Sequence, residues 1–329
     1  MRTVTLGRSG LEVSCIAYGG GPLGGGMGHF DEEASVASVR RARELGITLF
    51  DTGRVYGRSE ELLGRALADH LRTDRDEIVI STKGGVRASG SENPGDGGVT
   101  RDSSAQALRA DLETSLATLG VDHIDLYQVH WPDPDVPLAE TAAVLAALRD
   151  EGKIRHIGVS NFTAAQMEEF AQGAPVETLQ PGYSMLHREP ENDELPHAQA
   201  NDVGVLVYGP LAHGLLTGTA FDPARAFGEY DWRRNHGLFA APTLQRNQAV
   251  VRRLDAFARE RGHTVSELAI AWVLAQPAVD VAIVGTGKAR HLDAAMPALD
   301  VVLSAQDLAE LDAILADAVA LPLFQLEDM

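Results

Sequence analysis

The chain has 329 residues, of which 44% are hydrophobic and 23% are charged, and its formal net charge is −19. This length allows one large core or two modest domains, and the strong acidity argues against nucleic-acid binding, which needs a basic surface. The single cysteine, Cys15, excludes a disulfide within the chain, and neither a secretory signal nor a run of about 18 apolar residues is visible, so we expect a cytoplasmic protein that does not span a membrane.

The first predicted element is an antiparallel hairpin. Val4 and Leu6 alternate with polar residues before the sequence GRSG, and Leu11 and Val13 alternate with polar residues after it. This is the pattern of two short strands joined by a tight turn. We expect the hairpin to cap the bottom of the fold that follows.

Short β-branched runs then alternate with amphipathic segments along most of the chain. The predicted strands are residues 15–19, 47–51, 77–83, 123–130, 154–160, 176–180, 203–209 and 279–285. Apolar periodicity, with helix-starting and helix-ending residues at the two ends, predicts helices over residues 31–46, 59–72, 102–120, 137–152 and 163–173. Strands that are apolar along most of their length are typical of parallel sheets, which are buried on both faces.

About eight strand–helix repeats in a chain of this size favour a (β/α)8 TIM barrel, with residues 1–329 forming a single domain. The alternative is a doubly wound open sheet with a Gly-rich dinucleotide-binding turn after its first strand. The stretch 19–28 supplies glycines, and Asp51 ends the second strand, where a ribose ligand could lie. The sequence TGRVYG that follows Asp51 nevertheless suits a catalytic loop better. The long irregular stretch 209–242 follows the seventh strand, so it should lie over the face where barrel active sites occur.

Four polar residues stand at or just after the ends of predicted strands: Asp51, Tyr56, Lys83 and His130. Taken singly, each has an ordinary explanation as a cap, a packing residue, a surface lysine or a hydrogen-bonded core histidine. Strands of a parallel barrel end at one face, so together these four side chains are predicted to meet. Histidines 123, 130 and 156 have no HExxH spacing, and no metal site is predicted.

The four side chains suit the reduction of a carbonyl group. Asp51 and Lys83 would lie on adjacent strands and form a partly buried pair. We expect the Lys83 ammonium to lower the pKa of the Tyr56 phenol, which makes Tyr56 a usable proton donor. His130 would donate a hydrogen bond to a carbonyl oxygen or orient it.

Several longer motifs occur in the order and at the spacing of one protein family. They are FDTGRVYG with SEELLGRAL, STKGG, LYQVHWPDP, EGKIRHIGVSNF, YGPLAHGLLTG and AWVLAQP with AIVG. With these motifs the chain resembles the aldo-keto reductase superfamily over nearly its whole length. It looks most like the bacterial reductases and the potassium channel β-subunit branch. The resemblance implies a (β/α)8 barrel, a nicotinamide cofactor and a tetrad of Asp51, Tyr56, Lys83 and His130 with Tyr56 as the proton donor.

The resemblance also implies the cofactor contacts. Ser160, Asn161 and Gln180 match the residues that bind the nicotinamide carboxamide, and Tyr208 matches the aromatic ring that stacks on the nicotinamide. The pyrophosphate would lie under a loop that contains Gly209, Pro210, Leu211 and Gly214. Arg233 or Arg234 would reach a phosphate from the long loop.

The end of the eighth strand departs from the family pattern. The family places Gln or Arg, and then Glu-Asn, where this chain has His291 and Ala294-Ala295. The implied nucleotide contacts here are Gly285, Gly287, Lys288 and His291, and Lys288 and Arg290 could supply charge for a 2′-phosphate. We therefore favour NADPH as the cofactor, with NADH as the alternative.

The sequence thus predicts an NADP(H)-dependent oxidoreductase that reduces an aldehyde or ketone. A nucleotide-binding regulatory subunit with little turnover is the alternative, because the channel β-subunits share the motifs. The substrate depends on the loops at 23–30, 87–101 and 219–241. Phe30, Tyr56 and Trp131 are the aromatic residues expected near it.

Overall fold

The computed structural model describes residues 1–25, 30–88, 98–218, 227 and 231–323. Eight parallel strands form a closed barrel in the hydrogen-bonded order β10-β11-β12-β3-β4-β5-β8-β9. They are β3 (Ile16–Gly19), β4 (Leu49–Asp51), β5 (Val79–Gly84), β8 (Ile124–Val129), β9 (Ile154–Ser160), β10 (Thr178–Gln180), β11 (Gly204–Tyr208) and β12 (Val281–Gly285). The predicted (β/α)8 barrel is confirmed, and the open-sheet alternative is wrong because β3 and β12 pair and close the sheet.

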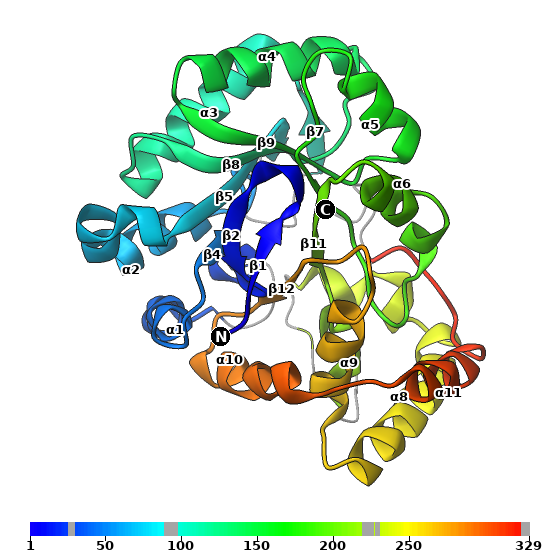
Figure 1. Cartoon of the computed structure of the whole chain (residues 1–329). Coiled ribbons are helices and arrows are strands. Elements are labelled where there is room, and N and C mark those ends of the chain that lie inside the picture. The colour runs from blue at the N-terminus through cyan, green and yellow to red at the C-terminus, as the bar shows by residue number, and fades with distance from the viewer. Residues whose placement is uncertain (26–29, 89–97, 219–226, 228–230, 324–329) are drawn as a thin grey trace.

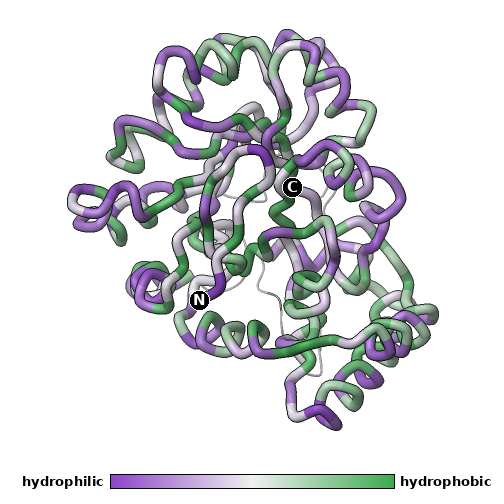
Figure 2. Tube along the Cα trace, in the orientation of Figure 1, coloured by the Kyte–Doolittle hydropathy of each residue, from purple (hydrophilic) through white to green (hydrophobic). Residues whose placement is uncertain are grey.

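Helices surround the barrel (Figure 1), and Figure 2 shows hydrophilic residues recurring along α1 and α2 at its periphery. Within the described ranges the α-helices are α1 (Glu32–Glu44), α2 (Ser59–Thr73), α3 (Ala105–Leu119), α4 (Leu138–Asp150), α5 (Ala164–Phe170), α6 (Glu194–Ala200), α8 (Thr243–Glu260), α9 (Val265–Leu274), α10 (Ala289–Ala295) and α11 (Ala305–Leu315). The helix expected from residue 102 begins at Ala105, because the Ser104 side chain accepts a hydrogen bond from the Ala107 amide and caps it.

The N-terminal hairpin closes one end of the barrel, as predicted. Its strands are β1 (Thr3–Leu6) and β2 (Leu11–Ser14), which pair antiparallel. Leu6 and Val13 are fully buried in an apolar cluster with barrel residues such as Leu49 and Val281. The backbone of Gly204, at the start of β11, packs so closely on Leu6 that a Cβ on Gly204 would lie 2.7 Å from the Leu6 carbonyl carbon.

The opposite end carries the connecting loops. After β5 the chain forms the two-stranded ladder β6 (Val86–Ala88) and β7 (Val99–Arg101). The described parts of the long loop before α8 contain the short 3-10 segments Ala212–Thr217, Trp232–Arg234 and Gly237–Phe239. Parts of the three expected substrate loops, residues 26–29, 89–97, 219–226 and 228–230, lie outside the described residues. Among the described residues, no helix is both long and apolar enough to cross a membrane.

Candidate active site

The four predicted residues lie at the carboxyl ends of three neighbouring strands. Asp51 is the last residue of β4, Lys83 lies near the end of β5, and His130 directly follows β8. Tyr56 lies in the turn between β4 and α2. Because β4 pairs with β5 and β5 pairs with β8, the barrel brings these side chains together.

Lys83 and Asp51 form a buried ion pair with 2.6 Å between Nζ and Oδ2. Lys83 also donates to the carbonyl oxygen of Thr52 at 2.8 Å. The other carboxylate oxygen, Oδ1, accepts from Ser81 Oγ at 3.0 Å and from Gln180 Nε2 at 2.8 Å. Lys83 is 1% exposed and Asp51 is 4% exposed, so the pair is shielded from water and held in one geometry.

Tyr56 and His130 contact each other beside this ion pair. The Tyr56 hydroxyl lies 3.3 Å from Nε2 of His130, and the two rings are nearly perpendicular at 86°. The Lys83 ammonium lies 5.2 Å from the centre of the Tyr56 ring. The phenol, imidazole and ammonium are therefore close enough to act on one small group.

The electrostatics of Tyr56 differ from the expectation. Burial, together with the negative charge of Asp51, raises the pKa of Tyr56. The positive charge of Lys83 does not reverse this rise, because that charge is largely balanced by Asp51 and because burial lowers the pKa of Lys83 itself. Burial and the Lys83 charge hold the pKa of His130 well below its usual value. Tyr56 is therefore protonated and His130 neutral at neutral pH.

A hydrogen-bonded network of the predicted nicotinamide residues adjoins the cluster. Tyr208 OH donates to Asn161 Oδ1 at 2.9 Å, and Asn161 Nδ2 donates to the His130 carbonyl at 3.1 Å. Asn161 Nδ2 also contacts Ser160 Oγ at 3.0 Å, and Ser160 Oγ donates to the Gln180 carbonyl at 2.9 Å. Asn161 has a φ of 62°, a left-handed conformation that asparagine adopts more readily than most other residues.

This network fits a carboxamide on a flat ring. A carboxamide needs both donors and acceptors, and the Ser160 hydroxyl and the Asn161 and Gln180 amides supply both kinds of group. The Tyr208 ring lies against Gly182, where an added Cβ would come within 2.9 Å of the Tyr208 hydroxyl. Because residue 182 has no side chain, the Tyr208 ring can lie close to the backbone that follows β10. In that position the ring can present a flat surface.

The predicted pyrophosphate loop contains two glycines in the left-handed region. Gly209 and Gly214 have φ values of 70° and 102°, which favour glycine. Pro210 and Leu211 lie between them at the start of the loop. Arg233 donates through Nε and Nη2 to the two carboxylate oxygens of Asp231, at 2.9 and 2.6 Å. Contact between Arg233 and a phosphate stays a prediction, and it would compete with this ion pair.

The predicted nucleotide residues after β12 join the barrel to α1 and α10. Thr286 Oγ1 lies 2.9 Å from Nδ1 of His291 and accepts from the Lys288 amide at 3.0 Å. A Cβ on Gly287 would lie 3.3 Å from Oγ of Ser35 in α1. Gly285 pairs with Gly19 of β3. Gly285 thus ends β12, Gly287 and Lys288 lie in the connection that follows, and His291 lies in the first turn of α10.

Sequence reasoning missed a second buried carboxylate beside the cluster. Glu60 is 1% exposed, and its Oε1 accepts from Thr82 Oγ1 at 2.8 Å and from Ser115 Oγ at 2.6 Å. Its Oε2 lies 3.4 Å from Arg54, whose amide donates to the Lys83 carbonyl. An acid in the first turn of a helix is normally explained by the helix dipole, so no pattern in the sequence separates Glu60 from Glu61.

Replacing Glu60 with Ala should lower the free energy of unfolding by about 3 kcal/mol, because two buried hydroxyl donors lose a charged acceptor. Glu60→Gln keeps an oxygen that can accept and should cost about 1 kcal/mol. Urea denaturation of the two variants measures the difference. Equal losses in both variants would contradict this role for the acceptor oxygen.

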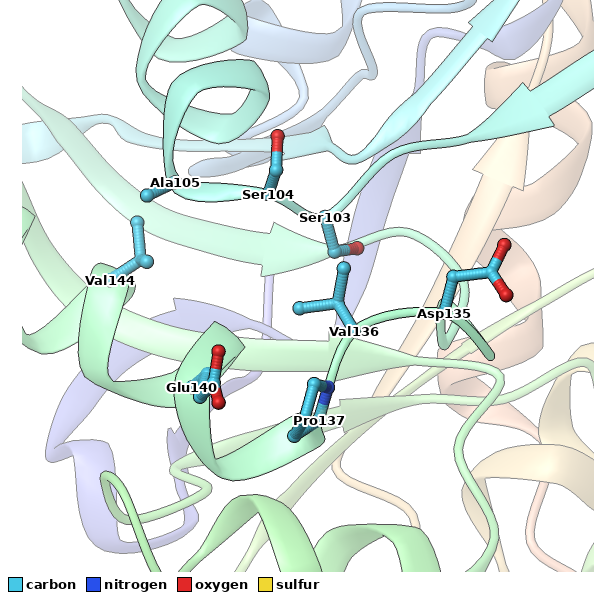
Figure 3. Close-up of a pocket in the computed structure, with 8 residues that line it drawn as sticks. All are labelled: Ser103, Ser104, Ala105, Asp135, Val136, Pro137, Glu140 and Val144. Carbon is cyan, nitrogen blue, oxygen red and sulfur yellow. The ribbon is translucent and has the colours of Figure 1, made fainter.

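A separate hollow of about 240 Å³ lies on the outside of the barrel (Figure 3). It is formed by the start of α3, the loop before α4 and α4 itself, and its lining residues are Ser103, Ser104, Ala105, Asp135, Val136, Pro137, Glu140 and Val144. None of the tetrad or predicted cofactor residues lines it. Among the described residues, no group of three or more His, Cys, Asp or Glu side chains could hold a metal ion.

The geometry agrees with the result of comparison with known proteins. A family model described as "Aldo/keto reductase family" matches residues 15–316. The chain belongs to the aldo/keto reductase family. Proteins of this family are oxidoreductases, and the barrel described above agrees with that membership.

Individual relatives within the aldo/keto reductase family cover nearly the whole chain. Aldo-keto reductase YhdN of Bacillus subtilis (strain 168) is 37% identical over 98% of this chain and 96% of its own. The NADH-specific methylglyoxal reductase of Escherichia coli (strain K12) is 32% identical over 93% of this chain and 96% of its own. The glycerol dehydrogenase AKR11B4 from Gluconobacter oxydans has a similar structure, with a TM-score of 0.85, 34% identity and coverage of 98% and 96%.

Proposed function

We propose that the protein reduces an aldehyde or ketone to an alcohol with NADPH, and that Tyr56 is the proton donor. The observation that carries the proposal is the position of the Tyr56 hydroxyl, 3.3 Å from His130 Nε2, on a ring whose centre lies 5.2 Å from the ammonium of the buried Lys83–Asp51 pair. Neutral reacting groups at this end of a barrel suit proton transfer to an oxygen that gains charge.

NADPH, when bound, supplies a hydride to the carbonyl carbon. Tyr56 then gives its hydroxyl proton to the carbonyl oxygen, and solvent restores that proton. His130, neutral because of its lowered pKa, orients the same oxygen by a hydrogen bond. Lys83 lies behind the phenol and stabilises the phenolate that Tyr56 becomes.

The cofactor is held by residues on separate strands in this proposal. Ser160, Asn161 and Gln180 bind the carboxamide, and Tyr208 stacks on the nicotinamide. The loop with Gly209, Pro210, Leu211, Gly214 and Arg233 covers the pyrophosphate. The adenosine end of the cofactor contacts Gly285, Gly287, Lys288 and His291. The positive charges of Lys288 and Arg290 favour binding of NADPH, which carries a 2′-phosphate, over binding of NADH, which does not.

The test is cofactor oxidation by the purified protein with a panel of aldehydes and ketones, using NADPH and NADH separately. We expect carbonyl-dependent oxidation of NADPH. In a Lys288→Ala, Arg290→Ala double variant the KM for NADPH should rise, and the KM for NADH should stay nearly constant. Glu61, an exposed acid of α2, provides a matched surface control as Glu61→Ala.

The possible results separate the parts of the proposal. A lower KM for NADH than for NADPH would overturn the cofactor preference, as would an unchanged NADPH KM in the double variant. Tight NADPH binding without turnover across the panel would favour the regulatory subunit. Failure to bind either nucleotide would overturn the function as a whole.

A further inference from the structure

The last described segment of the chain contacts the rest of the protein at both of its ends. In Figure 1 the red segment after α11 runs back toward β11. Asn247 in α8 is fully buried; its Nδ2 donates to the Val319 carbonyl at 3.0 Å, and its Oδ1 accepts from the Val319 amide at 2.8 Å. At the other end of this segment, Leu323 is 1% exposed and belongs to the main core. We call residues 319–323 the C-terminal clasp.

The C-terminal clasp contacts the start and the middle of the predicted pyrophosphate loop. His213 Nε2 lies 2.6 Å from the Leu323 carbonyl oxygen. A carbonyl oxygen only accepts, so Nε2 carries the proton in this contact. Gly209 faces the side chain of the same leucine, and a Cβ on Gly209 would come within 2.8 Å of Leu323 Cδ1. Leu323 thus touches the loop through its backbone and through its side chain.

The loop has an unusual backbone where the clasp holds it. Ala212 and His213 have φ values of 46° and 54°, a conformation that favours glycine or asparagine. Residues stay in this region only where surrounding contacts enforce it. Arg233, held by Asp231, supplies one such contact by donating to the His213 carbonyl at 3.1 Å. The bond to Leu323 supplies another.

We propose that the C-terminal clasp holds the loop at 209–218 in its nucleotide-binding conformation, and that His213 is the positioning residue that joins the two. The inference rests on the proposed function, because it takes this loop as part of the cofactor site. Within the described part of the chain, His213 bonds to Leu323 and Arg233, and neither partner belongs to the tetrad or to the predicted nicotinamide residues. Its loss should therefore weaken cofactor binding more than it slows the chemical step.

Two substitutions at His213 separate the hydrogen bond from the backbone conformation. Asn tolerates the left-handed region, but its short side chain cannot reach Leu323, whereas Gln can present an amide donor near the position of Nε2. We expect His213→Asn to raise the Kd for NADPH about ten-fold, the effect of losing one buried hydrogen bond. His213→Gln should stay within about three-fold of the wild type, and the KM for NADPH should change more than kcat in both variants.

A third variant tests the clasp from a distance. Asn247→Leu removes both bonds to Val319 and lies outside the loop, so it should also raise the Kd for NADPH. Hydrogen–deuterium exchange of residues 209–218 in protein without nucleotide should increase in Asn247→Leu and in His213→Asn, but not in His213→Gln. Thermal melts of each variant show whether the whole fold is affected.

Each result bears on the proposal. An unchanged Kd and unchanged loop exchange in His213→Asn would overturn it, as would equal changes in the Asn and Gln variants. A lower melting temperature with unchanged Kd and exchange would give His213 a structural role only and would overturn it too. If the wild type binds neither NADPH nor NADH, the proposed function fails, and the exchange measurement still decides whether the clasp orders the loop.

Discussion

Tyr56→Phe is expected to lower kcat by about 10²–10⁴-fold, the usual contribution of a positioned proton donor. The substitution removes the hydroxyl, which lies 3.3 Å from His130, and leaves the ring that packs beside Lys83. The Kd for NADPH should change little, because the lost oxygen is placed to act on the substrate. Steady-state kinetics together with nucleotide titration measure both quantities.

Tyr208→Phe is the matched control, since it removes the same atom from a neighbouring tyrosine. The Tyr208 hydroxyl donates to Asn161 Oδ1 at 2.9 Å and is therefore engaged in the predicted nicotinamide network. This variant should lose less than about ten-fold in kcat, with the main change in cofactor binding. Equal losses of kcat in the two variants, or wild-type turnover by Tyr56→Phe, would rule out Tyr56 as the proton donor.

Lys83→Met should be the most destabilising substitution at the site. It leaves the Asp51 carboxylate buried without its cation, and breaking a buried pair in this way costs about 3–5 kcal/mol. Activity should also be lost, because the phenolate that forms on Tyr56 would have no cation behind it. Urea denaturation gives the change in the free energy of unfolding.

The double variant Asp51→Asn, Lys83→Met separates stability from activity. Asn at position 51 keeps the oxygen that accepts from Ser81 and Gln180, while both buried charges are removed. We expect it to recover most of the stability lost by Lys83→Met and none of the activity. A single Lys83→Met variant as stable as the wild type would show that the ion pair is not the main support of this cluster.

The relation between fold and sequence is clearest at the strands. Runs such as residues 281–284 are apolar because both faces of a barrel strand are buried, so they identify the strand wherever it lies. The alternation of strands with capped helices leaves few other architectures. Contacts that join distant segments have no such local signal, because any pair of segments could form them.

The predicted site residues were found for a similar reason. Asp51, Lys83 and His130 are polar residues at the ends of apolar strands, a position that itself indicates function in a parallel barrel. Glu60 was missed because an acid early in a helix has a common local explanation. The raised pKa of Tyr56 could not be predicted either, since it depends on how completely the folded chain excludes water and on how Asp51 neutralises Lys83.

Sequence alone determined the barrel, the N-terminal hairpin, and the ends of the strands where the polar residues meet, because periodicity and residue type express burial along each segment. Only the tertiary structure decided which groups form hydrogen bonds with each other. Examples are the Gln180 amide with Asp51, the Thr82 hydroxyl with Glu60, and the His213 ring with the Leu323 carbonyl. These contacts join segments up to 129 residues apart. These contacts form only when the closed barrel packs as a whole, so no local pattern of residues specifies them.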